Sequence, residues 1–241
     1  MILRRLTKHV NEQNWFAVGL DMLVVVVGIF VGLQISNLNE ARKNVLKGES
    51  YLNRIAAELE QDIEFFDATL RVNTMGAENG LFLLSTLENE ELVRDNPTKF
   101  ILTIAGLGST LKINVSNNTF EEIKFSGNLE LIDNEDLRNK IADYYDFIEM
   151  ERNWSHARVL VENTYSSLNV GILRVDQMSQ FNPNNEELYS AEEAMVAYGK
   201  FKQNKAMINW IPTVVNSKRN NVFFDTSAQR RAKELVVEIR K

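Results

Sequence analysis

Between Trp15 and Asn37 the chain carries an almost unbroken apolar run, FAVGLDMLVVVVGIFVGLQI. An α-helix needs about 20 such residues to cross the hydrocarbon core of a bilayer. Buried helices of globular proteins average about half that length and combine apolar with polar faces. No polar side chain lies between Met22 and Leu33. The run therefore predicts a membrane-spanning helix at residues 16–36.

One narrow stripe of this helix collects small and polar residues. At about 100° per residue, the stripe contains Asn14, Asp21, Gly28, Gly32 and Asn39. Gly28 and Gly32 form a GxxxG pair, which lets two helix backbones approach closely in lipid. An aspartate at the centre of a membrane helix costs about 2.5 to 3.5 kcal/mol, and the cost falls when the carboxyl group faces a partner. We interpret the stripe as a self-association face.

Two other interpretations of the same residues stay open. Glycine is common in membrane helices, so Gly28 and Gly32 could be tolerated without any partner. Asp21 could be a proton-carrying or ion-coupling carboxylate, as in pumps. A single spanning helix encloses no pathway, and no second charge accompanies Asp21 in the run. A structural use of Asp21 in an interface is therefore favoured.

The flanks of the apolar run predict its orientation. Residues 1–15 form a basic amphipathic segment, with Arg4, Arg5 and Lys8 mostly opposite an apolar side. Basic residues also follow the run, but a short basic tail normally stays in the cytoplasm, and no small-residue cleavage pattern appears. We expect an uncleaved signal anchor, with a cytoplasmic N-terminus and a large C-terminal domain outside the cytoplasm. The absence of cysteine excludes disulfides and gives no redox evidence for either compartment.

Residues 37–241 are long enough for one soluble domain, which we expect to be an α-helical bundle. A long helix should leave the membrane directly from Leu38 to Leu70 and lie on other helices, because Leu38, Val45, Leu52, Leu59 and Phe66 recur every seventh residue. A break is expected at residues 73–76, followed by two shorter helices, one from Ala77 and one after Pro97. Residues 107–118 are expected to form a loop.

Capping signals predict the helices of the second half. Thr119 should cap a short helix in a capping box with Glu122, Gly127 should end it, and Asn134 should cap a long helix that runs toward Leu168. Pro183 should close that region. Two further helices are expected at 186–201 and, after Pro212, at 228–241. The fold class is therefore all-α, with one N-terminal transmembrane helix continuing into an extracytoplasmic α-helical bundle.

Two strings carry a resemblance to known proteins. RRLTKHVNEQNWFAVGLDMLVVVVGIFVGLQISNLNE, together with TFEEIKFSGNLELIDNEDLRNKIADYY, resembles an uncharacterised family of bacterial single-pass inner-membrane proteins. In that family the basic start, the NWF entry, the intramembrane acid, the glycine face and the Asn-Glu exit recur together. The resemblance implies a bacterial inner-membrane protein and brings no catalytic residue with it.

Signatures of common catalytic chemistry are missing from the sequence. The two histidines, His9 and His156, lie in no metal-ligand spacing, and there is no cysteine, so neither a metal site nor a cofactor is expected. No phosphate-binding glycine loop and no GxSxG motif occurs. His156 also lines up with Glu149 and Arg152 at helical spacing, which is typical of a solvated, salt-bridged face. The net charge of −6 argues against nucleic acid as a partner.

Four aromatic residues concentrate on the predicted long helix. Tyr144, Tyr145, Phe147 and Trp154 could line a small-ligand pocket between bundle helices, although aromatic residues at helical spacing are mostly core.

Three classes of function follow from these patterns. The favoured one is a membrane-anchored, non-enzymatic scaffold that self-associates through its transmembrane helix or recruits another membrane protein. The alternative is a sensor or accessory subunit of a membrane complex, whose helical domain binds a small ligand. An enzyme is the third choice, because carboxylates can form sites that a single sequence does not reveal.

Overall fold

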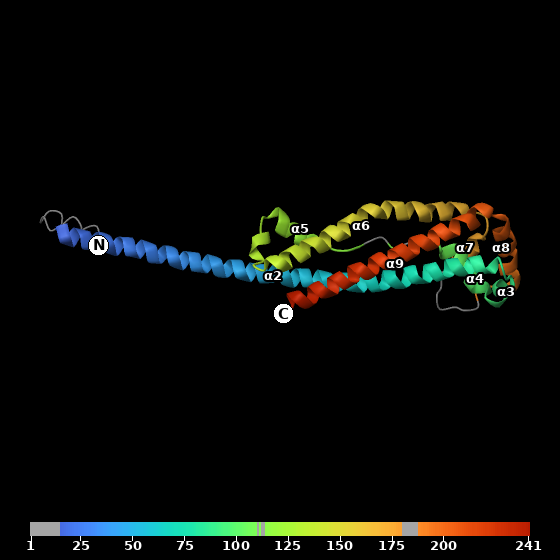
Figure 1. The fold of residues 1–241 in the computed structure, drawn as a ribbon, viewed down its shortest axis with the longest axis horizontal. Helices are drawn as coiled ribbons and strands as arrows, with labels where there is room; N and C mark the ends of the chain where they lie inside the picture. Colours follow the sequence, from blue (N-terminus) through green and yellow to red (C-terminus); the bar gives the residue numbers. More distant parts are fainter. Residues whose placement is uncertain (1–14, 110, 112–113, 180–187) are drawn as a thin grey trace.

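Three long helices form the body of the molecule. The structure is a computed structural model that describes residues 15–109, 111, 114–179 and 188–241. Helices α2 (Trp15–Thr86) and α6 (Glu135–Leu168) run in the same direction, and α9 (Lys205–Ile239) returns antiparallel to both (Figure 1). Within the described residues all regular elements are helical, with no strand, as the sequence predicts.

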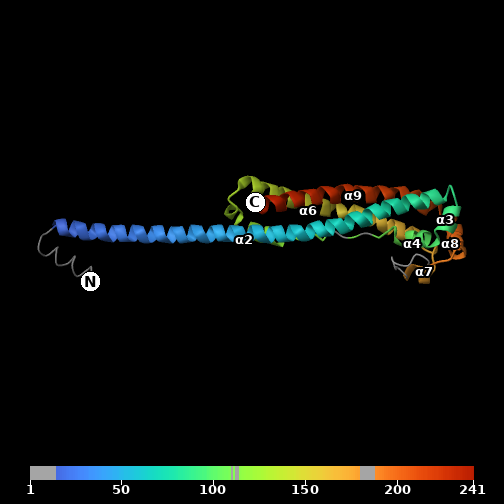
Figure 2. The same cartoon turned by 90° about the horizontal axis from the view of Figure 1, so that it is seen from below.

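Short helices close the two ends of this bundle (Figures 1 and 2). The end nearest the N-terminal half of α2 is closed by α5 (Asn118–Phe125) and the 3₁₀ helix η1 (Leu129–Leu131). The opposite end carries α3 (Glu91–Asp95), α4 (Pro97–Gly106), α7 (Val175–Ser179) and α8 (Ala191–Gln203).

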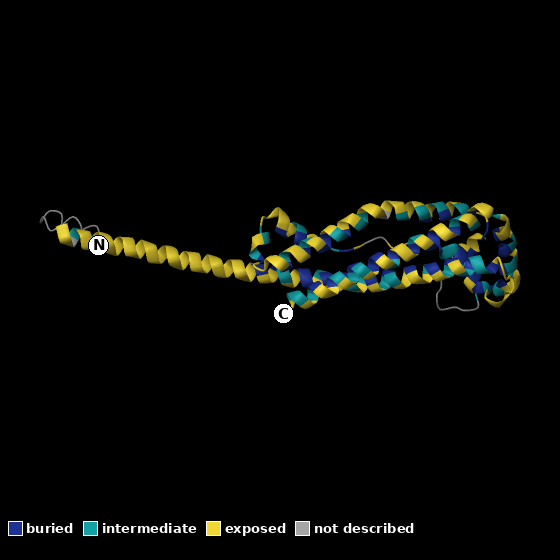
Figure 3. Ribbon diagram, in the orientation of Figure 1, coloured by how far each residue is buried: buried dark blue, intermediate teal, exposed yellow. Residues whose placement is uncertain are grey.

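The first half of α2 stands away from the bundle. This helix has 72 residues, which at 1.5 Å per residue gives a length of about 108 Å. Among the described residues, α2 is the one helix that is long and apolar enough to cross a membrane. The most apolar 18-residue window of α2 has a mean hydropathy of 2.3 and contains no buried residue (Figure 3). From Val18 onward, Gly48 is the first buried residue along α2.

The contact between α2 and the bundle therefore begins later than the seven-residue repeat predicts. Leu38 and Val45 are exposed, whereas Leu59 and Phe66 are fully buried. At Gly48 a Cβ would collide with the carbonyl oxygen of Leu131, so the close approach of α2 to η1 requires glycine. Residues 37–47 thus form an exposed helical stalk, which we call the stalk below.

The break predicted at residues 73–76 is wrong, because α2 continues without interruption to Thr86. Asn73 is buried and donates a hydrogen bond to Asp225 of α9 at 3.0 Å. Gly76 lies against the aliphatic part of Lys218, also on α9. Asn73 and Gly76 therefore serve the close contact between α2 and α9. That contact explains why polar residues followed by glycine, a pattern typical of a turn, occur inside a continuous helix.

Several predicted ends and caps are confirmed. Asn134 caps α6 by accepting a hydrogen bond from the amide of Leu137, and α6 ends at Leu168. Gly127, just after α5, has a φ of 67°, as expected for a left-handed helix stop. Helix α4 begins at Pro97, and the described residues between α4 and α5 form no regular helix or strand.

Other local predictions are wrong. The Thr119–Glu122 capping box is absent, because Asn117 is the cap residue, two positions earlier than predicted, and the Thr119 hydroxyl donates to Glu58 Oε1 at 2.7 Å. The last helix begins at Lys205 and contains Pro212, since buried residues on both sides of the proline pack into the core. Helix α8 begins at Ala191, later than the predicted 186. The basic segment at residues 1–14 and Pro183 lie outside the described residues.

The core of the bundle has two apolar parts separated by a polar layer. One apolar cluster, including Ile55, Phe66 and Ile141, fills the end nearest the stalk. The other cluster, including Phe100, Tyr198 and Phe201, fills the far end. The buried polar residues between them form the polar layer, which includes Thr69, Asn73, Glu162, Lys218, Asn221 and Asp225.

Candidate functional site

The structure places four residues of the predicted membrane stripe on the exposed part of α2. A Cβ added to Gly28 or Gly32 would meet no atom within 4 Å. Asp21 is half-buried, and its Oδ2 has no hydrogen-bond partner among the described residues. Asn39 is exposed at the start of the stalk, and Asn14 lies outside the described residues.

The stripe and the bundle lie on nearly opposite sides of α2. From Gly28 to Gly48 there are 20 residues of continuous helix, which correspond to about 200° of net rotation at about 100° per residue. Gly48 faces η1, inside the bundle. The side of α2 that carries Gly28 and Gly32 is therefore directed away from the bundle.

The predicted aromatic pocket separates into two groups. Tyr144 and Tyr145 are buried in the apolar core, with 1% and 5% of their surface exposed. Tyr144 donates a hydrogen bond to Asp62 Oδ2 at 3.0 Å, and the Tyr145 ring stacks on Phe120. Burial raises the pKa of both tyrosines, which therefore stay protonated at neutral pH.

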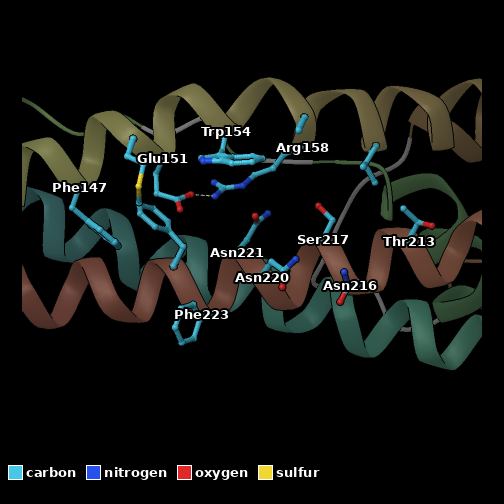
Figure 4. A pocket seen from close by; sticks show the side chains of 14 residues that line it. Phe147, Glu151, Trp154, Arg158, Thr213, Asn216, Ser217, Asn220, Asn221 and Phe223 are labelled. Carbon is cyan, nitrogen blue, oxygen red and sulfur yellow. Dashed lines mark hydrogen bonds and ion pairs between the residues drawn. The ribbon is translucent and has the colours of Figure 1, made fainter.

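Phe147 and Trp154 line a cavity between α6 and α9 (Figure 4). From Glu149 to Val161 no residue of α6 whose burial is described is buried, so this stretch leaves the core. The cavity has a volume of about 500 Å³. We call it the α6–α9 cavity. Its polar lining comes from Glu151 and Arg158 on α6 and from Thr213, Asn216, Ser217, Asn220 and Asn221 on α9.

An ion pair lies in the wall of the α6–α9 cavity. Glu151 and Arg158 are seven residues apart on one face of α6, and their side chains pair while only 15% and 18% exposed. The Arg158 guanidinium also lies over the Phe224 ring, 5.3 Å from its centroid. Because both charges are mostly shielded from water, removing one would leave the other poorly compensated.

Asn221, which lines the same cavity, has a buried side-chain oxygen that accepts no hydrogen bond from the described residues. The residue is 4% exposed, and its Nδ2 donates to Asn73 Oδ1 at 3.4 Å. Its Oδ1 is buried without a hydrogen-bond partner among the described residues. Asp225 lies next to this group and accepts from Asn73; burial raises the pKa of Asp225 to about 6.

A larger cavity of about 890 Å³ lies between α2 and α4. Its charged lining includes Lys218, whose side chain is 1% exposed. The Lys218 ammonium group donates to Glu162 Oε1 at 3.0 Å and to the carbonyl oxygen of Ser109. The Lys218 cation is thus compensated within the chain, and no described residue that lines this cavity has a buried side-chain atom without a hydrogen-bond partner.

Sequence reasoning missed Glu151, Arg158 and Asn221. The seven-residue spacing of Glu151 and Arg158 indicates one helix face, yet nothing in it distinguishes a cavity wall from a solvated surface. Of the predicted salt-bridged face, Glu149 is 61% exposed, whereas its partner Arg152 is half-buried and also donates to the carbonyl oxygen of Val115. Within the described residues no group of three histidine, aspartate or glutamate side chains could hold a metal ion.

Comparisons with known proteins give no relative for this chain. No protein-family model, no curated protein and no solved structure matches it. The resemblance to bacterial single-pass inner-membrane proteins therefore stays a prediction, and function has to be argued from the geometry.

Proposed function

We propose that the protein is a membrane-anchored, non-enzymatic scaffold that self-associates through its transmembrane helix. Residues 16–36 span a bacterial inner membrane, the preceding segment is cytoplasmic, and residues 37–241 form a periplasmic helical domain. The observation that carries the proposal is the continuity of α2, in which a fully exposed apolar segment and a buried bundle helix are one uninterrupted helix.

Two features of α2 support this assignment. A continuous apolar surface of this length is unfavourable in water, since soluble monomers rarely expose large apolar patches, and it matches the bilayer core. The Gly28–Gly32 side is open and faces away from the bundle, so a second copy can approach it without a clash between the helical domains. Asp21 lies on the same side, and its buried Oδ2 has no hydrogen-bond partner among the described residues.

The test is the assembly state of the full-length protein in nanodiscs, measured by native mass spectrometry. The wild type is expected to form a defined homo-oligomer. Gly28→Leu/Gly32→Leu is expected to be monomeric, because the added side chains prevent close backbone contact. Gly19→Leu is the matched control, since Gly19 is about 180° from Gly28 around α2 and also has open space around it. Unchanged assembly of the double variant would contradict the proposal.

A second candidate function is a sensor or accessory subunit, and the α6–α9 cavity favours it. The cavity volume of about 500 Å³ lies in the range of small-molecule sites, about 300 to 1,000 Å³. Its floor is α9, which packs along α2, so a shift at the cavity has a direct mechanical route toward the membrane. A monomer that co-purifies with a different membrane protein would favour this function over the scaffold.

A further inference from the structure

The α6–α9 cavity is lined by one carboxylate, Glu151, one guanidinium, Arg158, and Asn221, whose buried Oδ1 has no hydrogen-bond partner among the described residues. Figure 4 shows the Glu151–Arg158 pair on α6 and Asn221 on the side of α9 that faces it. Trp154 stands beside Arg158 and is 63% exposed, so most of the indole surface is available for contact. Phe147 is less available, because it stacks on Phe224 and the Arg231 guanidinium covers its ring.

We propose that the α6–α9 cavity binds a free α-amino acid with an apolar side chain. Glu151 and Asn221 Oδ1 accept hydrogen bonds from the α-ammonium group, Arg158 donates to the α-carboxylate, and the side chain lies against Trp154. This inference rests on the second proposed function, and it adds the class of ligand.

Charge balance selects a zwitterion over a simple ion. The Glu151–Arg158 pair is mostly buried, so a ligand that takes one partner must supply a replacement for the other. A lone amine would displace Arg158 and leave it without a partner, and a lone carboxylate would do the same to Glu151. A zwitterion compensates both charges, and the lining charges themselves sum to zero.

The unpaired side-chain oxygen of Asn221 is a second, independent indication that the ligand carries a hydrogen-bond donor. A buried carbonyl oxygen without a donor costs about 1 to 3 kcal/mol, and Asn221 Oδ1 is in this condition. An ammonium group has three N–H donors. If Glu151 and a solvent molecule each accept one hydrogen bond, one donor is left for Asn221 Oδ1. Hydrogen bonding to Asn221 removes that cost. Among the described residues that line the larger cavity between α2 and α4, no buried side-chain atom lacks a hydrogen-bond partner.

The experiment is calorimetric titration of the full-length protein in nanodiscs with three compounds that share one phenyl body. L-Phenylalanine carries both charged groups, 2-phenylethylamine lacks the carboxylate, and 3-phenylpropionate lacks the ammonium group. L-Phenylalanine is expected to bind, and each analogue is expected to bind at least about tenfold more weakly, since a charge-assisted hydrogen bond contributes about 1.5 to 3 kcal/mol. Empty nanodiscs correct for partition into lipid.

Variants assign the binding to this cavity. Glu151→Gln is expected to weaken L-phenylalanine binding at least tenfold, whereas Glu149→Gln, the same change two residues away on the exposed side of α6, should leave it unchanged. If Glu151→Gln does not fold, Trp154→Ala replaces it, because an exposed side chain contributes little to folding. It should reduce affinity several-fold.

Four outcomes would overturn the inference. No binding of L-phenylalanine at millimolar concentration would exclude it, and so would equal affinity for either analogue. Tight binding of 3-phenylpropionate alone would overturn the amino-acid assignment while leaving the cavity as a ligand site, so the two failures are distinguishable. Binding that survives both Glu151→Gln and Trp154→Ala would place the ligand elsewhere.

Discussion

Glycines in α2 fall into two physically different groups. At Gly48 and Gly80 a Cβ would collide with the carbonyl oxygen of Leu131 and with the Val215 side chain, so these glycines are required by packing within the bundle. Gly28 and Gly32 have open space on all sides. A glycine inside a helix costs about 0.5 to 1 kcal/mol relative to alanine, and packing within one chain does not account for that cost at Gly28 and Gly32. A partner helix would.

Two buried aspartates make the polar interior sensitive to pH. Asp62 accepts hydrogen bonds from Tyr144 and from the amide of Ser116, and Asp225 accepts from Asn73. Burial raises the pKa of each aspartate from an ordinary value of 3.8 to about 6, against the opposing effect of these hydrogen bonds. Nearby charges act in both directions: Arg152 and Arg158 lower these pKa values, whereas Glu58 and Glu151 raise them.

The free energy of unfolding is therefore expected to fall as pH rises between about 4 and 6.5. In that window the folded protein binds more protons than the unfolded chain, because the folded pKa values are the higher ones. Asp62 and Asp225 should each contribute on the order of 1 to 3 kcal/mol, present below the window and lost above it. Urea denaturation followed by circular dichroism at several pH values measures the slope.

Matched variants identify the groups responsible for that slope. Asp62→Asn and Asp225→Asn should each remove about half of it, and Asp146→Asn, at an exposed position of α6, should leave it intact. An unfolding free energy that is constant or rises across the window in the wild type would contradict the assignment.

At the scale of elements, the sequence predicts helices better than it predicts their interruptions. The α6 helix follows from the Asn134 cap and a regular apolar line, both of which are local signals. The break expected at residues 73–76 fails because the partners of Asn73 and Gly76 are Asp225 and Lys218, about 150 residues away in the chain. Such partners are invisible to local pattern reasoning, in which polar residues followed by glycine indicate a turn.

The α6–α9 cavity could be predicted only in part, because it too depends on packing that local sequence patterns do not show. Phe147, Glu151, Trp154 and Arg158 follow one another at spacings of four, three and four, so they share one face of α6. Sequence periodicity could have grouped them. It could not indicate that α6 leaves the core after Ile148, and this departure turns the face from a packing surface into a cavity wall.

The proposed self-association face of α2 has a directly testable position. Asn37 and Asn39 are both exposed at the start of the stalk, and about 200° separates them around the helix. Asn39 belongs to the stripe seven residues after Gly32. A repeat of seven is typical of helices that cross at a shallow angle and stay in contact over several turns.

We expect Asn39→Cys to form a cross-linked dimer under mild oxidation in membranes, and Asn37→Cys to form several-fold less. The chain has no native cysteine, so each variant carries a single thiol. Non-reducing electrophoresis measures the dimer fraction, and a reducing sample is the control. Equal cross-linking at both positions would exclude a defined α2 interface at this level.

At the scale of the whole molecule, the antiparallel course of α9 returns the C-terminus to the end of the bundle nearest the stalk. Arg240 donates hydrogen bonds to Asn53 and Glu60, near the start of the bundle part of α2. If residue 36 marks the membrane surface, these partners lie about 25 to 36 Å above it, and Thr86 lies about 75 Å above it. The molecule is then a rod that stands on its anchor, with the α3, α4, α7 and α8 end farthest from the lipid (Figure 1).

Energy transfer from single fluorophores to acceptors on lipid headgroups tests this geometry in nanodiscs. The dye pair is chosen so that its transfer distance lies between the heights of the two labelled sites above the membrane. A donor at Lys241→Cys is then expected to transfer energy efficiently. A donor at Glu88→Cys, just after the end of α2, is expected to transfer energy weakly. The stiffness of the continuous helix is the reason, since the described part of α2 has no internal break at which the bundle could fold back. Equal transfer from both sites would mean that the bundle lies along the membrane. The α6–α9 cavity and the stalk would then lie at the lipid surface, and the argument for an upright dimer would be lost.

Cleavage of the stalk is the control. A protease site inserted at residue 44 should, when cut, abolish energy transfer from both positions, because the signal depends on attachment through α2.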